Sequence, residues 1–229
     1  MTAADGGRAA SSTGRRILLL VGSVGAGKGT QAAALSKELG LAHLASGNLF
    51  RQALRDGSEL GGRARAYMER GDLVPDDLTI EMFMQELSRP AAARGAILDG
   101  FPRTVAQALA LDETLASSGE GIERVISIEV PVEELVARVA GRRVCPQCGT
   151  PYHVESDPPL VPGRCDHDGA ELQQRDDDRP EVVRARLAKQ VVPMLEVLEH
   201  YEQRGIVQHV DGRQPIDAVT QQILAGLRG

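Results

Sequence analysis

The 229-residue sequence predicts an α/β fold, with a parallel five-stranded sheet covered by helices on both faces. The first observation behind this prediction is that short apolar runs alternate with segments of helical periodicity along the whole chain. The second is that the first apolar run, 16–21, ends in a glycine-rich turn that leads directly into a helical segment. Alternation of this kind builds right-handed βαβ units, whose strands are parallel and whose ligands bind beyond the strands' carboxyl ends.

Each expected strand is a short apolar run bounded by turn-forming residues. The five expected strands are 16–21, 41–45, 96–99, 125–130 and 206–210. The expected helices lie between and after them, at 28–39, 48–56, 60–70, 76–88, 104–118, 131–141, 179–203 and 215–227. Two stretches, 46–74 and 142–178, interrupt the alternation and are interpreted as insertions near the ligand edge. Insertions placed there can close over a bound substrate.

Composition and charge exclude several classes of protein. A hydrophobic content of 42% is enough for one sizeable core, whereas 3% aromatic residues without Trp argue against stacking platforms for single-stranded nucleic acid. The net charge of -6 argues against nucleic acid or an anionic membrane as a partner, and no apolar run reaches the length of a membrane span. Residues 1–15 are small and polar without a signal-peptide core, so we expect a disordered extension and a cytoplasmic protein.

The glycine-rich turn that follows the first strand has the pattern of a phosphate-binding loop. Gly22, Gly25 and Gly27 allow successive backbone N–H groups to point at one anion, with a helix N-terminus behind them. Lys28 adds a charge for the outer phosphates, and the Thr30 hydroxyl can face a phosphate or Mg²⁺. The pattern is that of a P-loop, which predicts binding of a nucleoside polyphosphate. By itself it does not separate a GTPase, a transport ATPase and a small-molecule kinase.

A second polar segment follows the third expected strand. Asp99 stands at the strand's carboxyl end, where a carboxylate beside a phosphate loop can hold Mg²⁺ through a water molecule. Arg103 follows on a turn fixed by Gly100 and Pro102, and its guanidinium can bind phosphate oxygens at two points.

The second insertion contains all three cysteines of the chain in a metal-ligand pattern. Cys145 and Cys148 form one short-spaced pair, and Cys165 and Asp168 form another after sixteen intervening residues. Two such pairs match the tetrahedral ligands of a structural Zn²⁺ in a loop-rich segment that has no core of its own. His167 is an alternative fourth ligand, although its spacing from Cys165 is one residue short. Free thiols, or a disulfide between the first two cysteines, are the alternative without metal.

Six segments, taken in order, resemble the signatures of adenylate kinases. They are GSVGAGKGTQ at 22–31, SGNLFR at 46–51, GDLVPDD at 71–77, LDGFPRTVAQA at 98–108, RVAGRRV at 138–144 and QRDDDRPEVVRARL at 174–187. The resemblance runs from about residue 16 to the C-terminus and implies three parts. These are a P-loop core (16–45, 75–140 and 179–229), a helical domain for the nucleoside monophosphate (46–74) and a lid (141–178) whose Cys₃Asp set resembles the zinc lids of many bacterial adenylate kinases.

The resemblance also implies which residues bind each nucleotide. The implied ATP site consists of Gly25, Ala26, Gly27, Lys28, Gly29, Thr30, Arg138, Arg142, Pro151, Tyr152 and Gln214. The implied AMP site consists of Ser46, Arg51, Asp72, Leu73, Val74, Gly100, Phe101, Pro102, Arg103, Gln107, Arg175 and Arg186, with Gln107 reading the adenine edge. The implied catalytic residues are Lys28, Arg103, Arg142, Arg175 and Arg186. Asp177 and Asp178 match a carboxylate pair that fixes Arg175 and Arg186.

We therefore expect reversible phosphoryl transfer from MgATP to AMP, giving two ADP, by a monomer whose two insertions swing freely. Phosphoryl transfer needs cations, in-line placement and exclusion of water, so no general base is expected. A uridylate/cytidylate kinase is the nearest alternative, but Thr104, Gln107 and the long cysteine lid favour AMP. A zinc-ribbon nucleic-acid-binding protein is the alternative from a different class, and a GTPase is disfavoured because no Asn-Lys-x-Asp segment is present.

Several residues depart from the family pattern or stay outside it. Val24 stands where the loop usually has proline, and Asn48 stands where the monophosphate segment usually has aspartate. Neither change touches the lysine or the arginines. The histidines at 43, 153, 200 and 209 have no nucleophile within a recognisable pattern, and we expect them to be surface or core residues.

Overall fold

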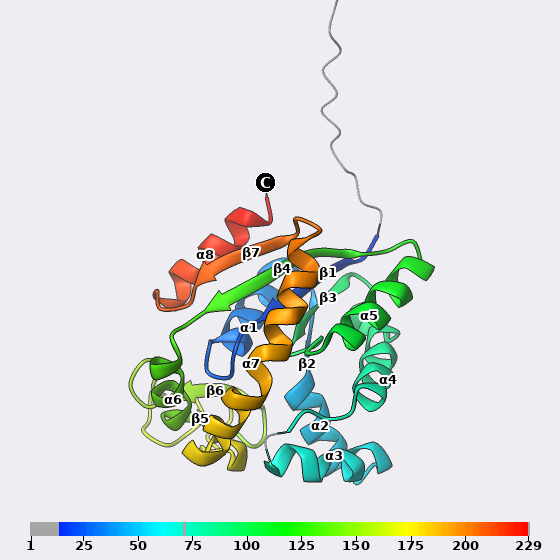
Figure 1. The fold of residues 1–229 in the computed structure, drawn as a ribbon. Helices are drawn as coiled ribbons and strands as arrows, with labels where there is room; N and C mark the ends of the chain where they lie inside the picture. Colours follow the sequence, from blue (N-terminus) through cyan, green and yellow to red (C-terminus); the bar gives the residue numbers. More distant parts are fainter. Residues whose placement is uncertain (1–13, 71, 229) are drawn as a thin grey trace, which may run out of the picture.

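The computed structural model, which describes residues 14–70 and 72–228, contains the expected five-stranded parallel sheet (Figure 1). Its strands are β1 (Arg16–Val21), β2 (Ala42–Ala45), β3 (Gly95–Asp99), β4 (Ile122–Glu129) and β7 (Val207–Asp211). They are arranged in the order β2-β3-β1-β4-β7, and every neighbouring pair is parallel. β4 begins three residues earlier than the expected strand, because Ile122 already pairs with Ile17 of β1.

The eight expected helices are present, with ends that differ from the expected ones by no more than two residues. They are α1 (Lys28–Leu39), α2 (Ser46–Arg55), α3 (Glu59–Arg70), α4 (Asp76–Leu87), α5 (Val105–Ser117), α6 (Val132–Ala140), α7 (Pro180–Glu202) and α8 (Ile216–Gly226). Two short 3₁₀ turns, η1 (Pro90–Ala92) and η2 (Asp176–Asp178), add to them. In Figure 1, α7 runs along the molecule from the lid side toward β7, between α6 and α5.

The continuous apolar run of β1 is explained by burial on both faces of the sheet. Ile17, Leu19 and Val21 point into a core shared with α4, α5 and the second half of α7, whereas Leu18 and Leu20 point into a core shared with α1 and α8. The first half of α7 joins the second core, so one helix contributes to both. The central strand is thereby held rigidly, and with it the turn at its carboxyl end.

The two insertions have different architectures. The first is helical and consists of α2 and α3, which pack on each other. The second contains a hairpin of two antiparallel strands, β5 (Arg142–Val144) and β6 (Pro151–His153), that no strand prediction anticipated. These strands were not predicted because each is only three residues long, which is too short to show a period of two. Within the described residues, this lid has a small core of Cys145, Tyr152, Cys165 and Leu172.

The start of the described chain is held against the core. Most of the extension expected to be disordered, residues 1–13, lies outside the described residues. Arg15, which that expectation included, is attached to the core: its guanidinium donates to Glu120, with Nε 2.8 Å from Oε1, and to the Leu87 carbonyl at 2.7 Å. Among the described helices, none combines the length and the apolar character that a membrane span requires.

Candidate active site

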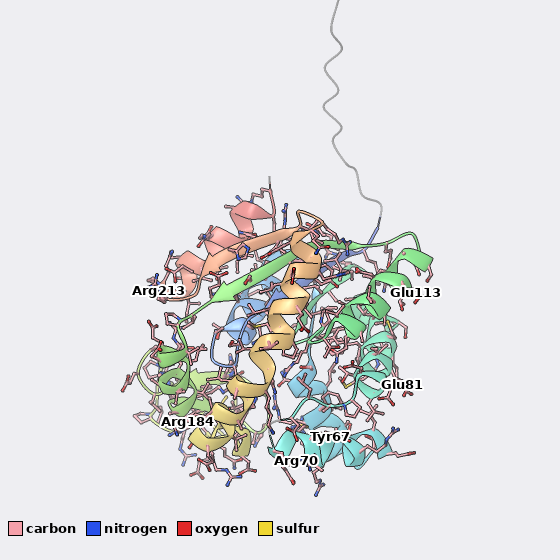
Figure 2. All side chains as sticks on the ribbon, in the orientation of Figure 1. Tyr67, Arg70, Glu81, Glu113, Arg184 and Arg213 are labelled. Carbon is pink, nitrogen blue, oxygen red and sulfur yellow. The ribbon has the colours of Figure 1, made fainter. Side chains whose placement is uncertain are left out.

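A single cavity of about 1450 Å³ brings together the P-loop, the helical insertion, the lid and α7. In Figure 2, Tyr67 and Arg70 mark α3 at the bottom of the view, and Arg184 marks the start of α7. The cavity is lined by nearly every residue predicted for the site: Gly25, Ala26, Gly27, Lys28, Gly29, Thr30, Ser46, Arg51, Asp72, Leu73, Val74, Asp99, Gly100, Arg103, Gln107, Arg138, Arg142, Pro151, Tyr152, Arg175, Arg186 and Gln214. Residues separated by up to 189 positions in the sequence therefore line one cavity.

The phosphate loop has the backbone that its glycines predict. Gly25 and Gly27 have φ angles of 86° and 93°, a left-handed region that strongly favours glycine. A side chain at Gly25 would also lie 2.8 Å from the Val139 side chain, so the loop is seated directly on α6. Val24 packs against the core beneath the loop, and the glycine conformations are retained with valine in place of the family's proline.

Lys28 is oriented by the loop itself. Its Nζ donates to the backbone carbonyls of Gly22 at 2.8 Å and Ser23 at 3.0 Å. Burial lowers the pKa of Lys28 to about 8; the carboxylate of Asp99 opposes the shift, and neighbouring arginines add to it. The ammonium group is therefore placed where an anion would relieve both its desolvation and the repulsion from other cations.

Asp99 lies at the end of β3 beside the phosphate loop, as predicted. Burial alone would raise the pKa of its carboxyl, but the hydrogen bond to His43 and the charges of Lys28 and Arg103 outweigh burial and lower it. The group is thus ionised at neutral pH. The Nε2 atom of His43 lies 3.4 Å from Asp99 Oδ2, so this histidine, expected to be merely structural, borders the site. The sequence signal was its place on β2, which neighbours β3.

Arg103 is held in place by three acceptors from three elements. Its Nε donates to the Gly100 carbonyl at 2.7 Å, Nη1 to Gln190 Oε1 at 3.0 Å and Nη2 to Ser46 Oγ at 3.0 Å. Ser46 begins α2, and Gln190 lies on α7 one turn after Arg186. No motif identified Gln190 in advance, because its role depends on contact with a residue 87 positions away.

The segment Gly100–Arg103 does not act as one binding surface. Phe101, predicted for the AMP site, does not line the cavity: it is buried and stacks on Phe83 of α4, with ring centroids 4.1 Å apart. Pro102 lines a smaller cavity between the phosphate loop and α7 instead. The apolar character of these two residues explains the difference, since they anchor the turn that presents Arg103.

Gln107 is almost completely buried, and hydrogen bonds to neighbouring residues orient its side-chain amide. Its Oε1 accepts from the backbone N–H of Arg103 at 2.8 Å, and its Nε2 donates to Asp76 Oδ1 at 2.7 Å. The other carboxylate oxygen of Asp76 accepts from Thr104 Oγ1 at 3.0 Å, and Thr104 caps α5 by accepting from the Gln107 backbone N–H. Gln107 and Thr104 were predicted from the sequence, whereas Asp76, which joins them from the start of α4, was not.

The arginines on the lid side are organised by carbonyl and carboxylate groups. Arg142 forms a two-point ion pair with Asp178, which is fully buried, with Arg142 Nε 2.7 Å from Oδ2. Asp178 was expected to fix Arg175 and Arg186, so its partner in the ion pair that the structure shows is a different arginine. The side chain of Asp177 lies outside the description. Arg138 Nη1 donates to the Gly212 carbonyl at 2.9 Å, which joins α6 to the loop that carries Gln214.

The helical insertion is connected to the rest of the site through charged residues. Asp72 accepts from Arg70 Nε at 2.9 Å and pairs with Lys189 of α7 at 2.5 Å. These hydrogen bonds lower the pKa of Asp72, first through Lys189 and then through Arg70. Arg51 donates to Asn48 Oδ1 at 2.9 Å, so the asparagine at the departure from the family pattern contacts a predicted phosphate ligand.

The cysteine pattern of the lid forms a compact cluster. Ligand atoms of Cys145, Cys148, Cys165 and Asp168 all lie within 4.8 Å of one another, and no disulfide joins the three cysteines. His167, the alternative fourth ligand, is not part of this cluster. Three sulfurs and one carboxylate oxygen at such spacing are a donor set that fits tetrahedral Zn²⁺, whose bonds to sulfur are about 2.3 Å long.

Charges within the cluster also suit a cation. The backbone N–H of Ala170 donates to Asp168, and this hydrogen bond, reinforced by the cysteine thiols, lowers the pKa of the carboxyl to about 2. Burial raises the pKa of the Cys145 thiol to about 11. A metal ion bound to the sulfur would supply a positive charge that favours the thiolate form.

His153, expected from the sequence to be a surface or core residue, also lines the cavity. Its Nδ1 accepts from the backbone N–H groups of Glu155 and Ser156, so Nε2 carries the proton. That Nε2 is buried and has no hydrogen-bond partner among the described residues. It lies against Gly141, where a Cβ atom would come within 2.4 Å of it, so a side chain at position 141 would displace the imidazole.

Taken together, a P-loop, an ionised carboxylate at the end of the neighbouring strand and several arginines lining one cavity define a phosphotransferase acting on a nucleoside monophosphate. Comparison with known proteins specifies the family. A family model described as adenylate kinase matches residues 20–206. Adenylate kinases from Staphylococcus epidermidis and Staphylococcus aureus are each 44% identical over 207 residues, which cover 90% of this chain and 96% of theirs. The chain belongs to the adenylate kinase family.

Proposed function

We propose that this enzyme transfers the γ-phosphoryl group of MgATP to AMP and releases two molecules of ADP. The observation that carries the proposal is the single cavity, which is lined both by the phosphate loop and by Arg103 and Gln107. Binding both nucleotides in one cavity converts a bimolecular encounter into a positioned one, worth on the order of 7–11 kcal/mol in well-oriented cases.

The ATP half is assigned to the loop and the lid. Backbone N–H groups of Gly25–Thr30 surround the phosphates, and Lys28 contacts the outer ones with its ammonium group. Arg138, Tyr152 and Gln214 border the base and sugar. This assignment is supported by the fact that all three residues line the cavity. Lid closure over this half excludes water, which would otherwise accept the phosphoryl group.

The AMP half is assigned to the helical insertion and the segment after β3. Ser46, Arg51 and Arg103 bind the phosphate, the backbone of 72–74 borders the sugar and base, and Gln107 reads the adenine edge. The fixed guanidinium of Arg103 supports this assignment, because a preorganised cation costs no rearrangement when charge develops. Arg142, Arg175 and Arg186 then converge on the transferred group, whose negative charge they stabilise in the transition state.

Two metal ions complete the proposal. Asp99, ionised and at the cavity wall, fits a water-mediated ligand of the Mg²⁺ that accompanies ATP and neutralises phosphate charge. Cys145, Cys148, Cys165 and Asp168 would hold Zn²⁺ in a purely structural role, since four protein ligands leave no position for substrate.

The cysteines, the two insertions and the net charge support proposals on location, assembly and partners. Three unpaired thiols in a metal cluster suit the reducing cytoplasm. A monomer allows the lid and the helical insertion to move independently. The acidic net charge makes nucleic acid an unsuitable partner.

The decisive experiment measures nucleoside diphosphate formation from MgATP with AMP, CMP, UMP and GMP separately, by chromatography. Strong turnover of AMP alone supports the proposal. A preference for CMP or UMP would remove Gln107 from its adenine-reading role. Absence of turnover with all four would reduce the assignment to nucleotide binding.

A further inference from the structure

Around Gln107 the structure contains a closed ring of hydrogen bonds that the reaction itself does not require. The ring passes from the Arg103 backbone N–H to Gln107 Oε1, from Gln107 Nε2 to Asp76, and from Thr104 Oγ1 to Asp76. It closes through the Thr104 cap on the backbone N–H of Gln107. Three of its four donor–acceptor distances are 3.0 Å or less and the fourth is 3.2 Å.

The chemistry of the ring allows only one orientation of the Gln107 amide. A backbone N–H can only donate, so it must face the amide oxygen, and a carboxylate can only accept, so it must face the amide nitrogen. Rotating the amide by 180° would place N–H against N–H at Arg103 and oxygen against oxygen at Asp76. Because Gln107 is 1% exposed, either mismatch would leave buried polar atoms facing groups that cannot pair with them.

A fixed amide presents a fixed pattern to a base. Each amide atom uses one hydrogen-bonding position in the ring, and among the described residues nothing else occupies the second N–H of Nε2 or the second lone pair of Oε1. Gln107 is among the residues that line the cavity, so a base that contacts it there would meet this donor–acceptor pair. Adenine matches it with N1 as acceptor and the 6-amino group as donor. In the same pose, hypoxanthine or guanine would oppose it with N1–H and O6.

We propose that Asp76 is a specificity-determining positioning residue, which fixes the Gln107 amide so that a 6-aminopurine monophosphate is accepted and a 6-oxopurine monophosphate is rejected. A glutamine free to rotate would pair with either base. The proposal rests on the proposed function, in that Gln107 must contact the base, and adds the reason why this contact can discriminate.

The test compares kcat/KM for AMP and for IMP in the parent enzyme and in Asp76→Asn. IMP is chosen because it inverts the N1 and C6 positions without adding the 2-amino group of GMP. Asparagine can present either an oxygen or an N–H to Gln107, so it removes the constraint from Asp76 while it keeps the side-chain shape, and only the Arg103 backbone N–H then still favours the parental orientation. Asp77→Asn is the matched control: it makes the same charge change one residue later on α4, at a side chain that is 72% exposed and 3.8 Å from Arg63.

We expect the AMP/IMP ratio of kcat/KM to fall by about tenfold or more in Asp76→Asn and to stay at the parental value in Asp77→Asn. An unchanged ratio in a folded Asp76→Asn enzyme would overturn the proposal. If that variant does not fold, the parent enzyme decides: the proposal requires that it reject IMP, and equal use of AMP and IMP would refute it. Failure of the proposed function gives a different result, namely no preference for AMP over CMP or UMP in the parent.

Discussion

The core and the lid place their functional groups by different means. In the core, the phosphate loop follows a strand that is buried on both faces, and Arg103 is fixed by acceptors from α2, α7 and its own turn. In the lid, the buried cluster among the described residues is small and includes two of the predicted metal ligands. A segment with so little apolar surface cannot offset the entropy of ordering, so a cross-link must do so. We therefore expect that removing a functional side chain from the core leaves the melting temperature nearly unchanged. Removing a metal ligand or the metal from the lid should lower it.

The largest expected effect tests the core. Arg103→Ala should lower kcat/KM for AMP by about 10³-fold or more, because arginines that stabilise phosphoryl transfer contribute on this scale. ATP affinity and the melting temperature should change little, since Arg103 contacts hydrogen-bond acceptors at the cavity wall and not the apolar core. Steady-state kinetics, ATP titration and thermal unfolding provide the three measurements.

Arg204→Ala is the matched control for this variant. Arg204 is a partly exposed arginine that pairs with Asp112 away from the cavity, and its loss should leave kinetics unchanged. Near-full activity of Arg103→Ala would show that the monophosphate site lies elsewhere. A large drop in its melting temperature would contradict the comparison between core and lid.

The next effect tests the lid. Removing metal from the purified protein with a chelator should lower the melting temperature by about 10 °C or more, because structural zinc sites contribute their binding energy to folding. Metal analysis before and after treatment must show that zinc was present and was removed. A melting curve that stays unchanged after verified removal would exclude a structural role, and Cys148→Ser should reproduce the destabilisation without a chelator.

The same contrast explains what the sequence could predict. The strands and helices of the core were predictable because burial imposes long periodic patterns on their sequences. The P-loop, Asp99 and Arg103 were predictable because they lie next to those elements. The lid hairpin was not, since three-residue strands carry no periodicity. Contacts across the fold were also missed: Gln190 to Arg103, Asp76 to Gln107 and Arg142 to Asp178 each join residues more than 30 positions apart. Pairings of this kind depend on how helices pack and leave no local signal.

A smaller effect concerns the charge state of the phosphate loop. Because burial lowers the pKa of Lys28 from 10.5 to about 8, the protonated form that attracts phosphate is lost as pH rises through 8, well before an ordinary lysine would lose it. We expect kcat/KM for ATP to be constant below pH 7 and to fall about tenfold per pH unit above 8. Lys28→Arg, which stays charged, should lack this decline, and a flat profile up to pH 9.5 in the parent would contradict the assignment.

The smallest effect concerns the departure from the family pattern at Asn48. Its Oδ1 already accepts from Arg51, so Asn48→Asp keeps the contact and adds one charge to an exposed pair. Exposed ion pairs contribute about 0.2–1 kcal/mol, so KM for AMP should change by less than about fivefold, with kcat unchanged. Asn48→Ala, which removes the contact, separates the charge from the hydrogen bond. A change above tenfold in Asn48→Asp would mean that Arg51 is positioned as tightly as Arg103, and that the helical insertion, like the core, places its cations before substrate binds.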